Sequence, residues 1–183
     1  MYRDLKLENV LLDHFGHIRL IDFGMSKPGL AEPEQSTKTL CGTPDYIAPE
    51  LLLKQPYTKS IDLWSFGILL WEMLNGHPPF EGKSLDETFK NILHAPIQPR
   101  LDRLKASRNI SPGAESLLLK LLKRTPCERL AENQMRKQKF FAGISWEKLY
   151  NKRLAPPYRP RVKDQNDLQN FDDKLTKQQP KDR

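Results

Sequence analysis

The chain has 183 residues, 38% of them hydrophobic, and its 30 Lys and Arg residues outnumber 23 Asp and Glu residues, which gives a net charge of +7. The most apolar segment, residues 61–74, is shorter than the ~20 residues that a membrane-spanning helix needs, and Asp62 and Glu72 interrupt it. The basic residues are mixed with acidic ones and accompany no aromatic stacking platform, which argues against binding to nucleic acid. Contact of the basic C-terminal residues with anionic lipid is the alternative use of this charge.

Three polar side chains lie close together near the start of the chain: Asp4, Lys6 and Asn9. Their short spacing is unsuited to opposite walls of a cleft and suits one tight loop on which the side chains converge. The carboxylate of Asp4 could orient a hydroxyl nucleophile, and the ammonium group of Lys6 adds a positive charge beside it. The segment therefore predicts the catalytic loop of an enzyme.

A β-hairpin is predicted directly after this loop. Residues 10–12 and 18–21 form two short apolar runs, and residues 13–16 between them have the composition of a turn. A hairpin would return Asp22 to the neighbourhood of Asn9. Carboxylate and amide oxygens brought together in this way suit Mg²⁺, which binds few protein ligands and keeps water and phosphate oxygens as the others.

The rest of the chain predicts helices up to a polar tail. A central helix over residues 60–75 ends at a stop signal, Asn75-Gly76, and a helix over residues 84–94 begins at a Ser cap with Glu87 three residues later. Further helices are predicted over residues 111–122, where Pro occupies the first helical position, and over residues 131–138. From residue 155 onward Pro, Arg, Asp and Gln predominate, which favours an extended, partly disordered tail.

The first motifs resemble the catalytic loop and the metal-binding motif of eukaryotic protein kinases, His-Arg-Asp-Leu-x-x-x-Asn followed by Asp-Phe-Gly. The chain reads Tyr-Arg-Asp-Leu-Lys-Leu-Glu-Asn at residues 2–9 and Asp-Phe-Gly at residues 22–24. Tyr in place of the His is usual in the basophilic AGC group, which includes protein kinases A, B and C. A Lys two residues after the Asp is typical of serine/threonine kinases.

Further motifs of the same group follow in the family order. They are similar to the activation segment with its Ala-Pro-Glu, the start of the central helix, the segment whose Arg pairs with that Glu, and the end of the domain with its tail, as in protein kinase C relatives. In this chain they occupy residues 39–50, 60–67, 125–130, 140–146, 156–158 and 170–172. Ordered motifs at family spacing leave little room for coincidence, whereas Asp-Phe-Gly alone is usually a turn.

The resemblance implies a protein kinase-like fold that is mainly α-helical with a short β-hairpin. None of the nine glycines forms Gly-x-Gly-x-x-Gly, and no Val-Ala-x-Lys precedes the catalytic loop. We therefore expect only the C-terminal lobe, without the N-lobe and the leading helices of the C-lobe. Residues 1–141 would be the kinase-domain fragment, and residues 142–183 a partial AGC-kinase C-terminal tail.

The family activity would be ATP-dependent phosphoryl transfer to Ser or Thr of protein substrates with nearby basic residues. Several residues acquire implied roles from their motif positions: Asp4 and Lys6 in catalysis, Asn9 and Asp22 in holding Mg²⁺, and Leu11 and Phe171 in contacting the adenine of ATP. Thr39 would be the site that an upstream activating kinase phosphorylates, with Arg3 pairing the phosphate. Glu8 and Glu72 would recognise basic substrate residues.

Other matched positions are implied to support the fold. Glu50 and Arg129 would form a structural ion pair, and Asp62 would hold the backbone of the catalytic loop. The polar start of the chain and two cysteines without metal-type spacing favour a cytoplasmic protein.

A second hypothesis is a non-catalytic lobe that binds substrates or regulators. It follows from the missing N-lobe motifs, because misplacing the ATP phosphates by about 1 Å can cost on the order of 10²-fold in rate. This chain alone is therefore predicted to be inactive or severely impaired.

Overall fold

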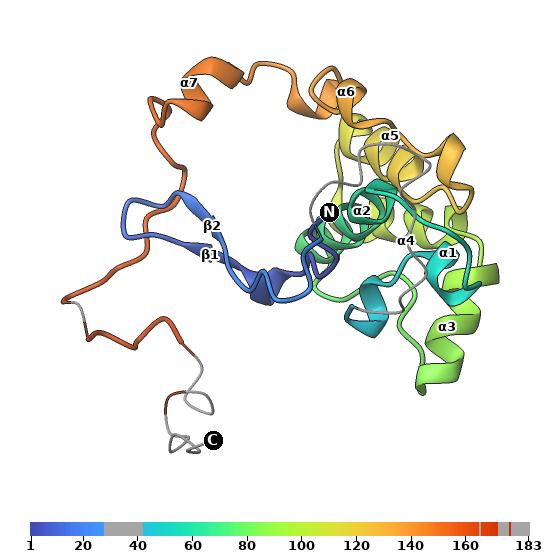
Figure 1. Ribbon diagram of the computed structural model, residues 1–183. Helices are drawn as coiled ribbons and strands as arrows, with labels where there is room; N and C mark the ends of the chain where they lie inside the picture. The colour runs from blue at the N-terminus through green and yellow to red at the C-terminus, as the bar shows by residue number, and fades with distance from the viewer. Residues whose placement is uncertain (28–41, 165, 172–175, 177–183) are drawn as a thin grey trace. The chain divides into compact units, whose positions relative to one another are not determined.

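Two units make up the part of the chain that the computed structural model describes, which is residues 1–27, 42–164, 166–171 and 176 (Figure 1). The helical unit contains residues 1–9 and the described residues of 21–144. The hairpin-tail unit contains residues 10–20 and the described residues from 145 onward. The predicted fold class, mainly helical with a short β-hairpin, is confirmed for the described residues.

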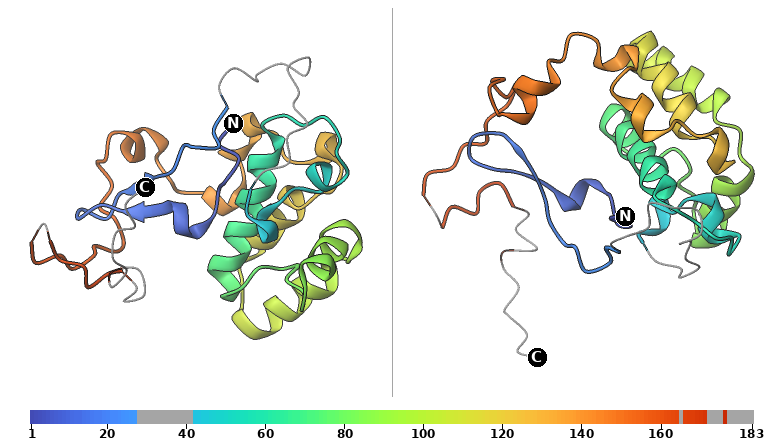
Figure 2. Two further views of the ribbon diagram at one scale, coloured as in Figure 1. Left: turned by 60° about the horizontal axis from the view of Figure 1, so that its bottom comes forward. Right: turned by 45° about the horizontal axis from the view of Figure 1, so that its top comes forward.

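The helical unit contains six α-helices within its described residues: α1 (Pro49–Leu52), α2 (Ser60–Asn75), α3 (Leu85–His94), α4 (Gln98–Arg108), α5 (Pro112–Leu121) and α6 (Glu132–Met135). Short 3₁₀ helices lie at Leu7–Asn9, Pro44–Tyr46, Pro126–Glu128 and Lys139–Phe141. Figure 2 shows these helices from two further directions. No helix within the described ranges is long and apolar enough to cross a membrane.

Helix α2 is the centre of the helical unit, and its predicted bounds are confirmed. It ends where Gly76 adopts a left-handed conformation with φ 95° and donates its N–H to the carbonyl of Glu72, as the stop signal predicts. Trp64 and Ile68 on α2 are fully buried, as is Leu117 on the packed helix α5. The apolar face of α2 therefore has its partner within the same unit.

Serine caps begin two of the predicted helices. The hydroxyl of Ser84 accepts the N–H of Glu87 at the start of α3, and that of Ser111 accepts the N–H of Ala114 at the start of α5. The Glu87 carboxylate accepts the backbone N–H of Lys83 at 2.7 Å, one residue before the cap itself. The capping arrangement therefore differs slightly from the predicted one.

Helix α4 has no counterpart among the predicted elements. Its sequence is strongly polar, and its first turn carries Pro99, which fits the start of a helix. Only Leu101 and Leu104 are buried on it, and Asn109 ends it with φ 49°. With so few apolar residues, the periodicity on which a sequence-based prediction depends is weak.

The hairpin-tail unit contains the antiparallel strands β1 (Val10–Leu12) and β2 (Ile18–Leu20), with Leu11 opposite Arg19. Asp13 shapes the turn, because its Oδ1 accepts the backbone N–H groups of Phe15 and His17. A short helix, α7 (Trp146–Tyr150), begins at a Ser145 cap and was not predicted. The hairpin itself lies where the apolar runs place it.

Candidate active site

Asp4 lies at the centre of a cluster of four polar side chains in the helical unit. It is 5% exposed, and its Oδ1 accepts the hydroxyl of Thr43 at 2.9 Å. Its Oδ2 accepts Nδ2 of Asn9 at 3.0 Å and lies 3.2 Å from Nζ of Lys6. Nζ of Lys6 also donates to the Thr43 hydroxyl at 2.8 Å. The structure therefore brings the predicted Asp4, Lys6 and Asn9 together and adds Thr43.

The backbone of this loop is held by Asp62 on α2. Its carboxylate accepts the N–H of Tyr2 at 2.9 Å and the N–H of Arg3 at 2.8 Å. Arg3 has φ 72°, a left-handed conformation that costs a residue with a side chain about 1–3 kcal/mol and persists only where the surroundings impose it. The two hydrogen bonds to Asp62 fix the backbone at this residue. Asp62 therefore contacts the backbone at the start of the loop, and its structural role in the family stays a prediction.

The chain segment that carries Asp22 returns to the loop within the helical unit. The backbone N–H of Ile21 donates to the carbonyl of Asn9 at 3.1 Å, and the phenol of Tyr2 donates to the carbonyl of Ile21. Burial raises the pKa of Tyr2, and the nearby charges of Asp4 and Asp22 raise it further. Asp22 is exposed and has φ 56°, a conformation that Asp tolerates better than most residues.

Asn9 and Asp22 have the chemistry of a magnesium site. Nδ2 of Asn9 is committed to the backbone carbonyl of Asp4 at 2.9 Å and to its carboxylate, which leaves Oδ1 as the acceptor atom of this amide. Together with the Asp22 carboxylate it offers two hard oxygen ligands, and Mg²⁺ often takes only one or two from the protein, adding phosphate and water. Among the described residues, no group of three or more His, Cys, Asp or Glu side chains is placed to hold a metal.

Glu50 and Arg129 form a bidentate ion pair, with Nη1 to Oε1 at 2.8 Å and Nη2 to Oε2 at 3.0 Å. The exposed fractions are 1% for Glu50 and 4% for Arg129. Arg129 also donates to the carbonyls of Ser60 and Lys123, and its guanidinium lies 5.4 Å from the ring centroid of Trp64. A buried pair with this many partners fixes the segment before α2 against the segment after α5.

Tyr46 contacts Glu72, one of the two predicted substrate-recognition residues, and is influenced by the charge of the other, Glu8. The phenol of Tyr46 donates to Glu72 and lies 3.5 Å from the backbone N–H of Leu7. Burial, followed by the hydrogen bond to Glu72, raises the pKa of Tyr46, and the charge of the exposed Glu8 adds to the shift. Tyr46 therefore brings Glu72 on α2 close to the loop that carries Glu8.

Two residues near this site were not assigned roles from the sequence. Thr43 joins Asp4 to Lys6 through its hydroxyl, and only its place inside the activation-segment motif could have indicated it. Burial raises the pKa of Asp45, and the charges of Glu81 and Glu8 raise it further. Asp45 therefore lies in the same acidic environment as Glu8.

Leu11 and Phe171, the predicted adenine contacts, lie in the hairpin-tail unit and line one groove there. The groove has a volume of about 500 Å³ and also includes Tyr158, Pro160 and Val162. Its size is within the usual range of small-molecule sites, ≈ 300–1,000 Å³. The structure therefore brings these two residues together across 160 residues of sequence.

The predicted phosphosite, Thr39, lies outside the described residues. Its predicted partner Arg3 donates from Nε to the carbonyl of Met25 and from Nη1 to the hydroxyl of Tyr57 at 3.4 Å. The pairing of Arg3 with a phosphate on Thr39 therefore stays a prediction.

The fold, mainly helical with a two-stranded antiparallel hairpin, is consistent with part of a protein kinase domain. Residues 1–141 match the family model of the protein kinase domain. The chain belongs to this family.

Individual relatives place it with the AGC-type serine/threonine kinases. It is 45% identical to serine/threonine-protein kinase YPK2/YKR2 of Saccharomyces cerevisiae over 185 residues, which cover 100% of this chain and 26% of that protein. Protein kinase C of Drosophila melanogaster is 44% identical over 98% of this chain and 24% of its own length. Human serine/threonine-protein kinase Sgk2 is 43% identical over 97% of this chain and 47% of its own length. The chain thus spans less than half the length of each of these relatives.

Proposed function

We propose that this chain supplies the catalytic loop, the metal ligands and the substrate-recognition residues of an ATP-dependent protein serine/threonine kinase. The observation that carries the proposal is the hydrogen-bonded cluster of Asp4, Lys6, Asn9 and Thr43. A buried carboxylate with this many donors has one fixed orientation, as a group that positions a substrate hydroxyl must have.

In the proposed reaction the oxygen of a substrate Ser or Thr forms a bond to the γ-phosphorus of ATP, and the bond between that phosphorus and the β–γ bridging oxygen breaks. Asp4 orients the hydroxyl and accepts its proton. Lys6 contacts the transferred phosphoryl group, and Asn9 and Asp22 hold Mg²⁺, which neutralises phosphate charge when bound. Leu11 and Phe171 contact the adenine.

Glu8 and Glu72 are proposed to recognise basic residues of the substrate. The contacts that support this are those around Tyr46, where Glu72 accepts the phenol and Glu8 lies near. The upstream kinase that phosphorylates Thr39 is a further proposed partner.

The test is a chimera in which this chain replaces the matched segment of YPK2/YKR2, assayed with ATP and a Ser peptide that carries arginines. The chimera is expected to phosphorylate the peptide, and Asp4→Asn to lower kcat by about 10²–10⁴-fold. Asp86→Asn, at an exposed carboxylate in the first turn of α3, is the matched control and should leave kcat unchanged. Full activity in the Asp4→Asn chimera would contradict the proposed role.

The isolated chain is expected to show negligible transfer, because no Gly-x-Gly-x-x-Gly occurs in its sequence. Binding of the arginine-containing peptide without transfer would favour the alternative function, a non-catalytic lobe that engages substrates through Glu8 and Glu72. Transfer by the isolated chain that Asp4→Asn abolishes would overturn the expected impairment and support the catalytic role.

A further inference from the structure

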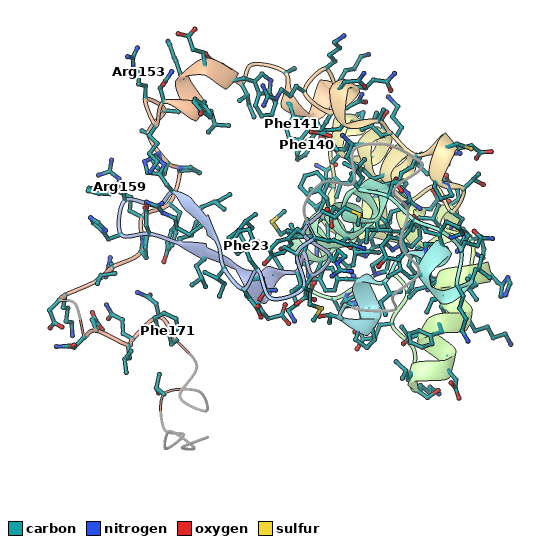
Figure 3. The ribbon with its side chains drawn as sticks, in the orientation of Figure 1. Phe23, Phe140, Phe141, Arg153, Arg159 and Phe171 are labelled. Carbon is teal, nitrogen blue, oxygen red and sulfur yellow. The ribbon has the colours of Figure 1, made fainter. Side chains whose placement is uncertain are left out.

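Gly16, in the turn of the hairpin, lies unusually close to the backbone of the tail. A Cβ atom at this position would lie 2.1 Å from the carbonyl oxygen of Tyr158 and 2.9 Å from Cβ of Pro156. Figure 3 labels Arg159, the neighbour of Tyr158, beside the turn end of the hairpin. Because the nearest atom belongs to backbone, no side-chain rotation could relieve the contact. Only glycine permits the tail to pass at this distance.

The turn cannot easily move away from the tail. Gly16 has φ 89° and donates its N–H to the carbonyl of Asp13 at 2.8 Å. The backbone N–H of Asp13 donates to the carbonyl of His17 at 2.8 Å, and Oδ1 of Asp13 accepts the N–H groups of Phe15 and His17 at 3.1 and 2.9 Å. Four hydrogen bonds therefore hold the turn in place.

The tail is held less firmly at the same point. Pro156, Pro157 and Pro160 have no backbone N–H to donate, so this stretch of the tail can form fewer hydrogen bonds than the turn. A side chain at residue 16 would therefore displace the tail and leave the turn in place.

The tail leads from this contact into the groove that contains Leu11. Tyr158, Pro160 and Val162 line the groove, and Phe171 reaches it further along. The carbonyl of Arg161 accepts the side-chain amides of Gln169 and Asn170, both at 2.7 Å, which closes the loop that ends at Phe171. The position of Phe171 beside Leu11 thus depends on where the tail crosses the turn.

We infer that Gly16 is a positioning residue that fastens the tail to the hairpin and so holds Phe171 at the adenine contact. The expected effect on nucleotide affinity rests on the proposed function. The attachment of the tail to the hairpin does not depend on catalysis. Gly16 touches neither nucleotide nor substrate and acts through the tail.

The chain offers a matched control in Gly143. It also has φ 89°, and a Cβ atom there would meet nothing within 4 Å. Gly143→Ala therefore introduces the same backbone strain without the clash. Gly16→Asn provides a second variant, because Asn tolerates positive φ better than Ala while its longer side chain retains the clash.

The first measurement is the rate of tryptic cleavage of the full chain between Arg161 and Val162, both exposed. Gly16→Ala and Gly16→Asn are expected to speed this cleavage roughly tenfold, because overpacking shifts the equilibrium toward the released tail. Cleavage after Arg108, at the end of α4, is the internal reference and should not change. Rates in both Gly16 variants equal to that of Gly143→Ala would overturn the inference.

Circular dichroism of the same variants separates release of the tail from unfolding. The cooperative melt of the helical unit is expected to be retained, since a contact in the hairpin does not support the core around α2. Loss of that melt in both Gly16 variants would also overturn the inference.

The second measurement is the affinity for a fluorescent N-methylanthraniloyl ATP. Gly16→Ala is expected to weaken binding about tenfold, the scale of a lost stacking contact between base and aromatic ring. In a Phe171→Ala background Gly16→Ala should add no further loss, because both changes remove one contact. Additive losses would contradict action through Phe171. If the wild-type chain binds no nucleotide, the proposal that this chain binds nucleotide is wrong. The cleavage rates alone then decide whether Gly16 fastens the tail.

Discussion

The burial of apolar side chains differs between the core of the helical unit and the hairpin. In the helical unit Trp64 and Leu118 are fully buried, whereas in the hairpin Phe15 is 55% and Ile18 66% exposed. Helices α2 and α5 bury their apolar faces against each other. Among the described residues, strands β1 and β2 pair only with each other. A two-stranded sheet has no further layer of its own to bury its faces, and an isolated hairpin is at best marginally stable in water. The helical unit therefore buries its core within the chain, while the hairpin leaves several apolar side chains largely exposed.

The largest expected effect tests burial of charge in the helical unit. Arg129→Met should lower the free energy of unfolding by about 3–5 kcal/mol, because it leaves the Glu50 carboxylate buried without its partner. The comparison is the Lys59–Glu132 pair, whose side chains are 53% and 67% exposed. Lys59→Met should cost less than about 1 kcal/mol. Urea unfolding followed by circular dichroism measures both values.

A double variant, Glu50→Gln with Arg129→Met, identifies the cause of the loss. It should recover part of the stability, because a neutral amide replaces the lone charge. A cost for Arg129→Met no larger than that of Lys59→Met would contradict the view that this buried pair organises the helical unit.

A somewhat smaller effect on the free energy of unfolding is expected when apolar side chains of the two units are truncated. Leu118→Ala on α5 should cost about 2–5 kcal/mol, because it leaves a cavity among buried neighbours. Ile18→Ala on β2 should change the free energy of unfolding by no more than about 0.5 kcal/mol, because this side chain is already largely in water. Equal costs for the two substitutions would show that the hairpin has a core of its own.

The sequence predicted the elements whose boundaries depend on local chemistry. Gly76 ends α2 because glycine accepts a left-handed conformation without penalty, and Ser84 and Ser111 begin helices because their hydroxyls satisfy free N–H groups. These requirements arise within a few residues. The sequence alone is therefore enough to predict them.

Features that depend on distant residues were not predicted. Helix α4 buries only Leu101 and Leu104. Its stability therefore comes more from packing against neighbouring elements than from an apolar periodicity in its own sequence. Thr43 reaches Asp4 from 39 residues away, and apart from the place of Thr43 in the activation-segment motif nothing in the sequence indicates the hydrogen bond. The family motifs indicated the candidate site residues, while the hydrogen bond of Thr43 to Asp4 and the groove that Leu11 shares with the tail required the fold.

The smallest expected effect concerns the hairpin at acid pH. Hydrogen bonds from the backbone of His17 and Phe15 hold the pKa of Asp13 below its ordinary value of 3.8. The Asp13 carboxylate therefore stabilises the folded turn fully above that ordinary value, and the contribution is lost as the pH falls through the lower pKa of the folded state. The amide chemical shifts of Phe15 and His17 should titrate with a midpoint below 3.8, while amides in the core of the helical unit should not follow this titration.

Arg19→Gln separates the two sources of this shift. Nε of Arg19 lies 3.3 Å from Oδ2 of Asp13 in an exposed pair, and its charge is a smaller cause than the backbone hydrogen bonds. The midpoint should rise only slightly in Arg19→Gln, because solvent screens an exposed pair whereas the backbone donors remain. A midpoint that returns to 3.8 in this variant would assign the shift to the ion pair. In that case the stability of the turn at Gly16 would depend on ionic strength, whereas the stability of a turn held by backbone hydrogen bonds would not.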